Sequence, residues 1–399
     1  MRKIDLPASP LLDHLAGAAG ELYSRTVVTY WRILRKTGTG KNGRKPVFLS
    51  QYAMEKLCMS PHLHSHTCDA IVGNFYASMK SANERKKKGN QEAKYPRRRK
   101  RFFKITWKSA GIRLKDGHLI LSNGKGNEPL VIPWAFDLPR QVEIGWKKTG
   151  GYELRATYAG ASPRPALGDG VAAVDQGELR AATVYDGEKV TIYSGRLVRS
   201  KARYRAKVLA KLDAKIARTR KGNAHVKSSR RRKKLIKAKQ RVTRRIDNQI
   251  RDILHKQTQH LVSTLHQRGV QTVVIGDIRD IRSSIKYGAK TNQKLHGWSF
   301  GRFRQMVTYK GARLGMQTVL MDEAYTSQTC PGCGERHKPR GRTYRCGCGF
   351  VCDRDGVGAM NIRAKYLGHF GAPVVGVMAP PLLGVRFRPH LSHVASASC

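Results

Sequence analysis

The stretch from Cys330 to Asp355 reads CPGCGERHKPRGRTYRCGCGFVCDRD and places two close pairs of cysteines about a charged turn. The four members of the two pairs are Cys330, Cys333, Cys346 and Cys348. Thiolates at this spacing can close a tetrahedral zinc site. The sequence therefore predicts a structural zinc knuckle, and the rarity of paired spacing disfavours scattered buried thiols as the explanation.

The second cysteine pair is one residue tighter than the common spacing, so Cys352 remains open as a substitute ligand. The knuckle, which we assign to residues 326–352, runs directly into the acidic turn Asp353-Arg354-Asp355. A carboxylate so near a rigid knuckle indicates that the knuckle positions chemistry as well as stabilising the fold.

Carboxylates also follow three apolar runs that precede the knuckle. The runs are typical of buried strands, and the acids at their ends are Asp175, Asp277 and the pair Asp322-Glu323. Each acid alone is a weak signal, because aspartates at strand ends are common as caps. Together with Asp355 they predict a cluster of the kind that two magnesium ions need to hydrolyse a phosphodiester, since these ions prefer oxygen ligands.

The charge of the chain points to a polyanionic partner. The 399 residues include 77 Lys and Arg against 27 Asp and Glu, a formal net charge of +50. A field of this size favours binding to a phosphate backbone. No apolar run is long enough to span a bilayer, and the N-terminus has no apolar segment of the signal-peptide kind. The cysteine usage suits a reducing cytosol with bound zinc.

Two segments concentrate the positive charge. Residues 199–245 contain 21 Lys and Arg and the single acid Asp213, and they read as a helical pair broken near Lys221-Gly222-Asn223. The other segment, residues 97–101, is flanked by aromatic residues, which favours nucleic-acid contact over a merely solvated face. The candidate contacts in the two segments are Arg97, Arg98, Arg99, Arg101, Arg230, Arg231 and Arg232.

Composition and periodicity divide the chain into regions. Residues 1–90 predict a helical lobe, with a long amphipathic helix over 10–36, and residues 91–165 predict short strands that form a small β-barrel. The tail at 368–399 predicts no ordered structure. The overall fold class expected is a multidomain α/β protein.

Between about Val171 and Ile362 the chain resembles the transposon-encoded TnpB proteins, relatives of Fanzor proteins and of miniature type V CRISPR effectors. The resemblance is most specific at two motifs, Thr326-Ser327-Gln328-Thr329-Cys330-Pro331-Gly332-Cys333-Gly334 and Asp353-Arg354-Asp355. It implies a ribonuclease H-like (RuvC) nuclease domain over residues 166–325, with a basic helical insertion at 199–267, and a final RuvC segment at 353–367. Residues 1–90 would be the recognition lobe and 91–165 the wedge domain.

The resemblance also implies an activity and its partners. The protein would be an RNA-guided DNA endonuclease with two catalytic Mg²⁺ and a structural Zn²⁺. Its guide RNA would come from the transposon end, and its target would be double-stranded DNA beside a short motif read by the protein. It would work without a membrane, in the cytoplasm of a prokaryotic cell and associated with the nucleoid.

Carried over to this chain, the resemblance makes Asp175 the first catalytic and magnesium-binding acid and Asp355 the last. The middle acid departs from the family pattern, because many relatives have glutamate where this chain has Gly276. Glu323 or Asp277 could replace it, and Glu323 is favoured because Asp277 is one residue out of phase on its strand.

Two other functions remain open at this point. One is a guided DNA-binding protein that does not cut DNA. It is considered because Gly276 stands where many relatives would have a catalytic glutamate. The other is a DDE-type transposase, which the knuckle between the last two acids disfavours.

Overall fold

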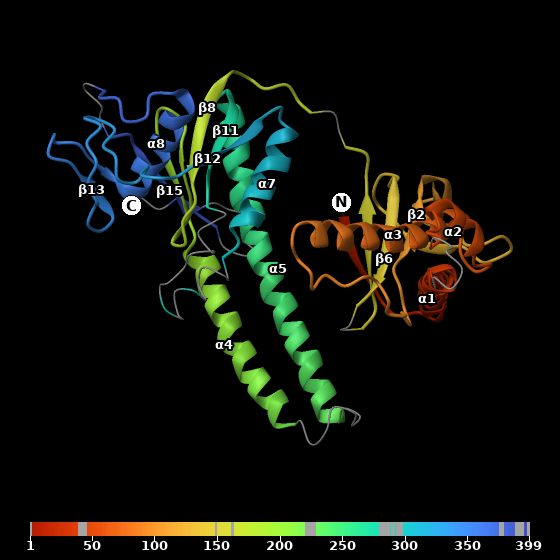
Figure 1. Ribbon diagram of the computed structural model, residues 1–399. Helices are drawn as coiled ribbons and strands as arrows, with labels where there is room; N and C mark the ends of the chain where they lie inside the picture. The colour runs from red at the N-terminus through yellow and green to blue at the C-terminus, as the bar shows by residue number, and fades with distance from the viewer. Residues whose placement is uncertain are drawn as a thin grey trace. The chain divides into compact units, whose positions relative to one another are not determined.

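The computed structural model describes residues 2–38, 46–147, 150–160, 163–219, 229–278, 288, 292, 298–374, 379–387 and 395–396. The chain forms two compact units, Met1–Gly160 and Ala161–Cys399, each with its own core (Figure 1). Within the described residues, every helix is too short or too polar to cross a membrane.

Three helices of the first unit begin where the sequence provides a cap. They are α1 (Pro10–Gly38), α2 (Gln51–Leu57) and α3 (Ser65–Lys87). The Ser9 hydroxyl accepts from the Leu12 N–H at 3.2 Å, and the Ser50 side chain accepts from the Ala53 N–H. Pro10 occupies the first helical position, where its missing N–H leaves no hydrogen bond unmade.

The strands of the first unit form two antiparallel sheets. One has the order β1-β7-β6-β2 and the other β3-β4-β5. Their bounds are β1 (Arg2–Leu6), β2 (Ile105–Lys108), β3 (Ile112–Lys115), β4 (His118–Leu121), β5 (Leu130–Pro133), β6 (Gln141–Trp146) and β7 (Tyr152–Thr157). The sequence analysis did not predict β1, which pairs with β7. Helices and sheets share a single apolar core that includes Leu22, Phe75 and Trp107.

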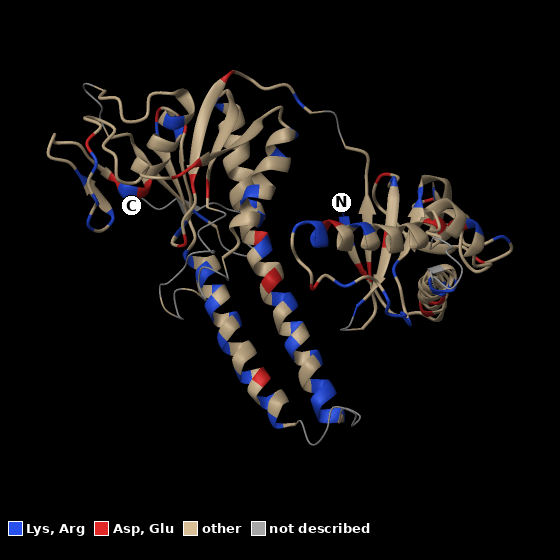
Figure 2. Ribbon diagram, in the orientation of Figure 1, with Lys and Arg blue, Asp and Glu red and all other residues tan. Residues whose placement is uncertain are grey.

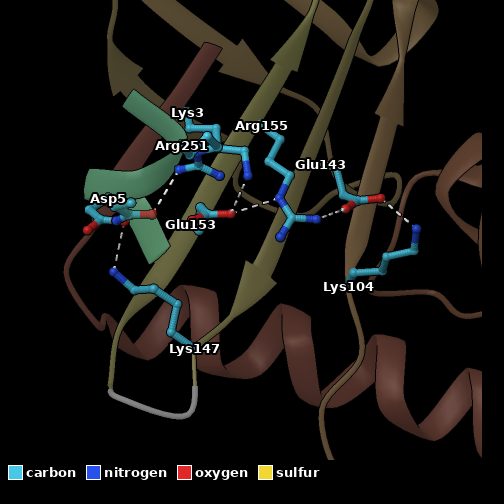
Figure 3. A network of polar contacts seen from close by, with 9 residues as sticks. Lys3, Asp5, Lys104, Glu143, Lys147, Glu153, Arg155 and Arg251 are labelled. Atoms are coloured by element: carbon cyan, nitrogen blue, oxygen red, sulfur yellow. Dashed lines mark hydrogen bonds and ion pairs between the residues drawn. The ribbon is translucent and has the colours of Figure 1, made fainter. Parts of the chain in front are cut away.

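A row of alternating charges crosses β6 and β7 (Figure 3). Arg155 pairs with Glu153 at 2.8 Å and with Glu143 at 3.1 Å, while Lys3 and Lys104 complete the row at its two ends. Exposed pairs of this kind contribute at most about 1 kcal/mol each. Glu143 and Arg155 stand directly opposite each other in the β6–β7 register, so this pair favours the observed pairing of the two strands.

The second unit is built on a mixed sheet of seven strands in the order β12-β11-β8-β9-β10-β15-β16. β9 is antiparallel to both β8 and β10, and β11 and β12 run parallel to β8. Their bounds are β8 (Gly170–Asp175), β9 (Arg180–Tyr185), β10 (Val190–Ser194), β11 (Val270–Asp277), β12 (Gln317–Asp322), β15 (Leu382–Arg386) and β16 (Ala395–Ser396).

Helices cover both faces of this sheet. α5 (Arg230–Gln267) and α7 (Phe300–Ala312) pack on the face that Val273 and Ile275 share. α8 (Arg354–Leu367) packs on the opposite face, where Ile362 meets Val274. Alternation along β11 thus buries the strand on both sides, as its continuous apolar sequence predicts.

The basic segment forms a hairpin of two long helices, α4 (Arg196–Arg218) and α5, with Lys and Arg spread along both (Figure 2). Inside the hairpin, Lys239 pairs with Asp213 and Arg205 pairs with Asp247. The predicted break at Lys221-Gly222-Asn223 lies outside the described residues. α5 is one continuous helix that runs from the basic segment into the core, because its apolar spacing continues without a helix-breaking residue.

The expectation that the tail at 368–399 has no ordered structure is wrong for part of it. β15 pairs in parallel with β10, in register from Val190↔Leu382 to Tyr193↔Val385. Val385 and Phe387 are buried in the core of the second unit. The tail is ordered here because β10 would otherwise be a sheet edge with unpaired backbone groups.

Candidate active site and zinc centre

The four cysteines of the two predicted pairs converge on one point. Their sulfur atoms all lie within 4.8 Å of one another, with Cys330 and Cys348 at 3.6 Å and Cys333 and Cys346 at 3.5 Å. The backbone N–H of Phe350 is the largest influence that lowers the pKa of Cys348, to about 7, which favours the thiolate. Four thiolates in this arrangement fit a structural zinc ion.

Cys352, the alternative ligand, is not a member of this group. It is buried on β14 (Val351–Asp353), which pairs with β13 (Thr343–Arg345) at the base of the knuckle. Burial raises the pKa of its thiol to about 11, so it remains a neutral apolar side chain. The four sulfurs that could hold a metal ion together are therefore those of Cys330, Cys333, Cys346 and Cys348.

The zinc knuckle is fastened to the helix that begins at the acidic turn. The buried side chain of Asn361, on α8, donates to the carbonyls of Thr326 and Thr329, both at 2.7 Å. Thr326 in turn donates its hydroxyl and its backbone N–H to the carbonyl of Glu323. One side chain thus links the knuckle, α8 and the loop that carries Glu323.

Asp175 is the last residue of β8, and its carboxylate lies against the backbone of α8. A Cβ atom at Gly358 would stand 2.4 Å from Asp175 Oδ2, so only glycine allows this approach. The pKa of Asp175 is raised to about 7, first by burial and then by the negative charge of Asp355.

Glu323 follows β12 directly and extends over Gly276 on the neighbouring strand. A Cβ atom at Gly276 would lie 1.7 Å from Glu323 Oε1 and 2.5 Å from its Cγ, so the glutamate occupies the space that a side chain at 276 would fill. Among the described residues, Glu323 Oε1 is buried without a hydrogen-bond partner. Burial, followed by the charge of Asp175, raises the pKa of Glu323 to about 8.

Asp355 stands in the first turn of α8, where the N-cap Asp353 accepts from the N–H groups of Asp355 and Gly356. Two arginines hold its carboxylate: Arg342 of the knuckle at 2.8 Å and Arg180 of β9 at 3.3 Å. Arg180 also pairs with Asp353. Asp355 is close enough to Asp175 to raise the pKa of that carboxyl.

The other two candidate acids point elsewhere. Asp277 lies 3.9 Å from Arg304 of α7, on the face of the sheet away from α8. Asp322 is largely exposed and pairs with Lys365 at 3.2 Å. Alternation along a strand puts neighbours on opposite faces, which explains why Gly276 and Asp277 cannot both face α8.

Asp175, Glu323 and Asp355 therefore share one end of the sheet, and their donor set suits a hard cation. Two buried carboxyls with raised pKa values and an unpartnered oxygen are the features that bound magnesium would satisfy. The carboxylate oxygens of the three acids are farther apart than the cysteine sulfurs. Among the described residues, only the sulfurs form a group with all ligand atoms within 4.8 Å of one another.

The candidate nucleic-acid contacts are exposed on both units. Arg97, Arg98, Arg99 and Arg101 extend from a segment whose backbone is fastened to α1, where Ser24 exchanges hydrogen bonds with the backbone of Lys100. Arg230 and Arg231 are exposed at the start of α5, whereas Arg232 donates to the Ile216 carbonyl of α4 at 3.0 Å. Arg232 therefore also holds the hairpin together.

Sequence reasoning missed three residues of the site: Arg180, Arg342 and Asn361. Arg342 lies within the knuckle and Asn361 lies on the helix that begins at the acidic turn, so their position was a usable signal. Arg180 gave no signal, because its role depends on β9 lying beside the acidic turn.

Two family models match parts of the chain. One, described as "Probable transposase" (OrfB of IS605), matches residues 152–282, and the other, "Cas12f1-like, TNB domain", matches residues 300–362. A protein of Streptomyces pristinaespiralis named "Putative RNA-guided DNA endonuclease" is 31% identical over 293 residues, which cover 69% of this chain and 67% of that protein. TnpB-like protein L79 of Acanthamoeba polyphaga mimivirus is 31% identical over 137 residues, 34% of this chain and 26% of that protein.

Solved structures share the fold. The structure of the Cas12f1-sgRNA-target DNA complex contains a chain that superposes with a TM-score of 0.59 at 13% identity, covering 88% of this chain and 82% of the other. The CRISPR-Cas_phi3 endonuclease superposes with a TM-score of 0.50 at 11% identity, covering 95% and 93%.

Proposed function

Because this chain belongs to the TnpB family of transposon-encoded proteins, we propose that it is an RNA-guided DNA endonuclease with a RuvC-type active site. The single observation that carries the nuclease assignment is the placement of Glu323 in the space over Gly276. It gives the end of the sheet a third acid beside Asp175 and Asp355, where the loss of the family glutamate would otherwise leave two.

The topology supports a ribonuclease H-like domain. The first three strands of the second unit are antiparallel neighbours, and α5 then leads to β11, parallel to β8 on its other side. This arrangement brings the carboxyl ends of β8, β11 and β12 to one edge, so that acids distant in sequence meet there.

In the proposed mechanism Asp175, Glu323 and Asp355 are the residues that would hold two Mg²⁺ ions. Bound magnesium would stabilise the attacking and leaving oxygens of the phosphodiester. Burial raises the pKa of both carboxyls, and the charge of Asp355 adds to the effect on Asp175 as that of Asp175 adds to the effect on Glu323, so bound cations would favour the loss of protons from both groups. Asn361 would hold the loop that carries Glu323, and Gly358 leaves room for the carboxylate of Asp175. Both would act as positioning residues.

The proposed partners are a guide RNA from the transposon end and a double-stranded DNA target beside a short motif. The net charge of +50 and the exposed arginines of both units support this. The four-cysteine knuckle would hold structural zinc and fix the turn that precedes Asp355. We also propose that the protein acts in the cytoplasm of a prokaryotic cell, beside the nucleoid.

The test begins with RNA that co-purifies with the protein, which is sequenced and used to design a matching plasmid. The protein should cut this plasmid with Mg²⁺ and leave a plasmid with a scrambled target intact. Binding of the matching plasmid with no cleavage under any divalent cation would instead establish a guided DNA-binding protein. Cleavage that ignores the guide would remove the RNA-guided part of the proposal.

A further inference from the structure

A pocket of about 300 Å³ opens on the face of the sheet away from α8, beside the end of β8. Its described lining residues come from α4, α5, α7 and the turn between β8 and β9. The volume is at the lower end of the range for small-ligand sites. Asp175, Glu323 and Asp355 do not line this pocket, so it is separate from the site that those three acids form.

The lining of the pocket includes both aromatic and aliphatic side chains. Trp298, Phe300 and Phe303 are the aromatic ones, and Val198, Ala202 and Leu254 are among the aliphatic ones. Surfaces of this kind accept the flat faces of a ring system.

An unsatisfied amide also lines the pocket. Gln176 is only 7% exposed, and its side-chain nitrogen is buried without a hydrogen-bond partner among the described residues. A buried polar group without a partner costs about 1–3 kcal/mol, so such a group indicates a missing partner. Gln176 directly follows Asp175, which places this amide next to the first acid of the site.

Positive charge surrounds the opening. Arg199, Arg203 and Arg205 of α4 belong to the lining of the pocket. Arg199 is partly neutralised by Glu178 at 3.0 Å and Arg205 by Asp247, whereas Arg203 is exposed. A ligand with a flat ring, hydrogen-bonding edges and an attached anion matches all three features.

We propose that the pocket takes one nucleobase of the single DNA strand whose backbone enters the acidic site, with Gln176 bonding the base edge and Arg203 facing the adjoining phosphate. This rests on the proposed function, because it assigns a subsite to the strand that is cut. The base would sit between Trp298 and the α4 wall, a short distance along the strand from the scissile phosphate.

The direct probe is 2-aminopurine, an adenine analogue whose fluorescence falls on stacking. It is placed at successive positions of single-stranded DNA and mixed with guide-loaded protein that carries Asp355→Asn to prevent cutting. One position, or two neighbouring ones, should show strong quenching. Equal signals at all positions would overturn the proposal.

Pocket-filling variants test the same point without removing core atoms. Ala202→Phe fills the cavity, and Gln176→Leu keeps the volume but removes the amide. Ala210→Phe adds the same bulk to an exposed position of α4 that does not line the pocket and serves as the control. In this protein Ala202→Phe should weaken single-strand binding by about 5- to 100-fold, the range expected for one stacked base. It should also abolish the position-specific quenching, while the control leaves both unchanged.

The outcomes separate this inference from the nuclease proposal. Quenching that Ala202→Phe abolishes, in a protein that never cuts, would support the pocket and remove the nuclease. Normal cutting with unchanged DNA affinity in both pocket variants would remove the pocket alone. If Ala202→Phe weakens guide RNA affinity but not DNA affinity, the occupant is not the DNA strand and the proposal is wrong.

Discussion

Gly276 is the residue on which the active-site account depends. The resemblance implies a glutamate at this position in many relatives, and here the glycine leaves a space that Glu323 enters from the next strand. Glutamate has one more methylene than aspartate, which gives Glu323 the reach to cross from β12 to β11. The absence of a side chain at position 276 and the placement of Glu323 in that space are thus linked.

We expect Gly276→Ala to reduce target cleavage by about 10²-fold, because the added methyl group must displace the Glu323 carboxylate. The matched control is Gly145→Ala on β6, where an added Cβ atom meets nothing within 4 Å. Cleavage rates of guide-loaded protein at saturating target provide the measurement. Equal rates in the two variants would mean that Glu323 is not needed where the structure places it.

The carboxyl groups of the site also predict a pH dependence of stability. In the metal-free protein the pKa values of Asp175 and Glu323 are about 7 and about 8, above their unfolded values near 4. At pH values between the unfolded and the folded pKa of each group, the folded state holds protons that the unfolded chain has released, so the free energy of unfolding falls as pH rises.

The free energy of unfolding in magnesium-free buffer should therefore decrease from pH 5 to pH 8, by roughly 1 kcal/mol or more. Urea unfolding of wild type and Glu323→Gln, both with zinc retained, measures it. The variant should show a flatter profile, and added Mg²⁺ should restore the wild type more at pH 8 than at pH 5. Parallel profiles would show that Glu323 does not titrate in this range.

At the level of single residues, the sequence allowed the cysteines and the acids to be identified, because their types and spacing are chemical signals. The preference for Glu323 over Asp277 rested on the resemblance, which implies an acid at position 276, and on the alternation of faces along the strand, and the structure places Glu323 over Gly276. Arg180 could not be identified, since an arginine among 77 Lys and Arg carries no signal until its neighbours are known.

Among the structural elements, the zinc knuckle offers the sharpest distinction between neighbouring cysteines. Cys348→Ser should lower the zinc content well below one ion per chain, because its sulfur belongs to the group of four. Cys352→Ser should retain one zinc per chain, because that thiol lies outside the group. Metal analysis of the purified variants decides between them, and the reverse pattern would make Cys352 the ligand.

The basic hairpin should act through its charge. Replacing both Arg230 and Arg231 with alanine should lower the slope of log affinity for guide RNA against log salt by about 1.4 units, at roughly 0.7 per phosphate contact. Arg232 is left in place because it holds α5 to α4. Arg113→Ala with Lys115→Ala, two exposed charges on β3, is the control. An unchanged slope in the first variant would mean that the start of α5 is only a solvated face.

The elements differed in how far the sequence predicted them. α1 and β8 were recognisable because their apolar spacing is regular and their ends carry caps or turns. β1 and β15 were not, because each is a short strand whose order depends on a partner distant in sequence. Pairing of that kind is a property of the folded chain and leaves little trace in a window of five residues.

The molecule as a whole consists of two units with separate cores, and the charged and metal-binding features are divided between them. The first unit exposes the arginines of residues 97–101, and the second carries the basic hairpin, the acids and the zinc knuckle. A net charge of +50 spread over both units suits a protein that functions only with nucleic acid bound, since the bare protein would repel itself.

We propose that Glu323 completes the active site of a guided nuclease. The most direct measurement compares cleavage of a matched plasmid by Glu323→Gln and by Asp277→Asn, each loaded with guide RNA in Mg²⁺. Glu323→Gln should cut at least about 10³-fold more slowly than wild type while binding guide and target normally, because a third anionic ligand is lost. Asp277→Asn should retain measurable cutting, since Asp277 faces α7. Cutting by Glu323→Gln at the wild-type rate, with none by Asp277→Asn, would contradict the account.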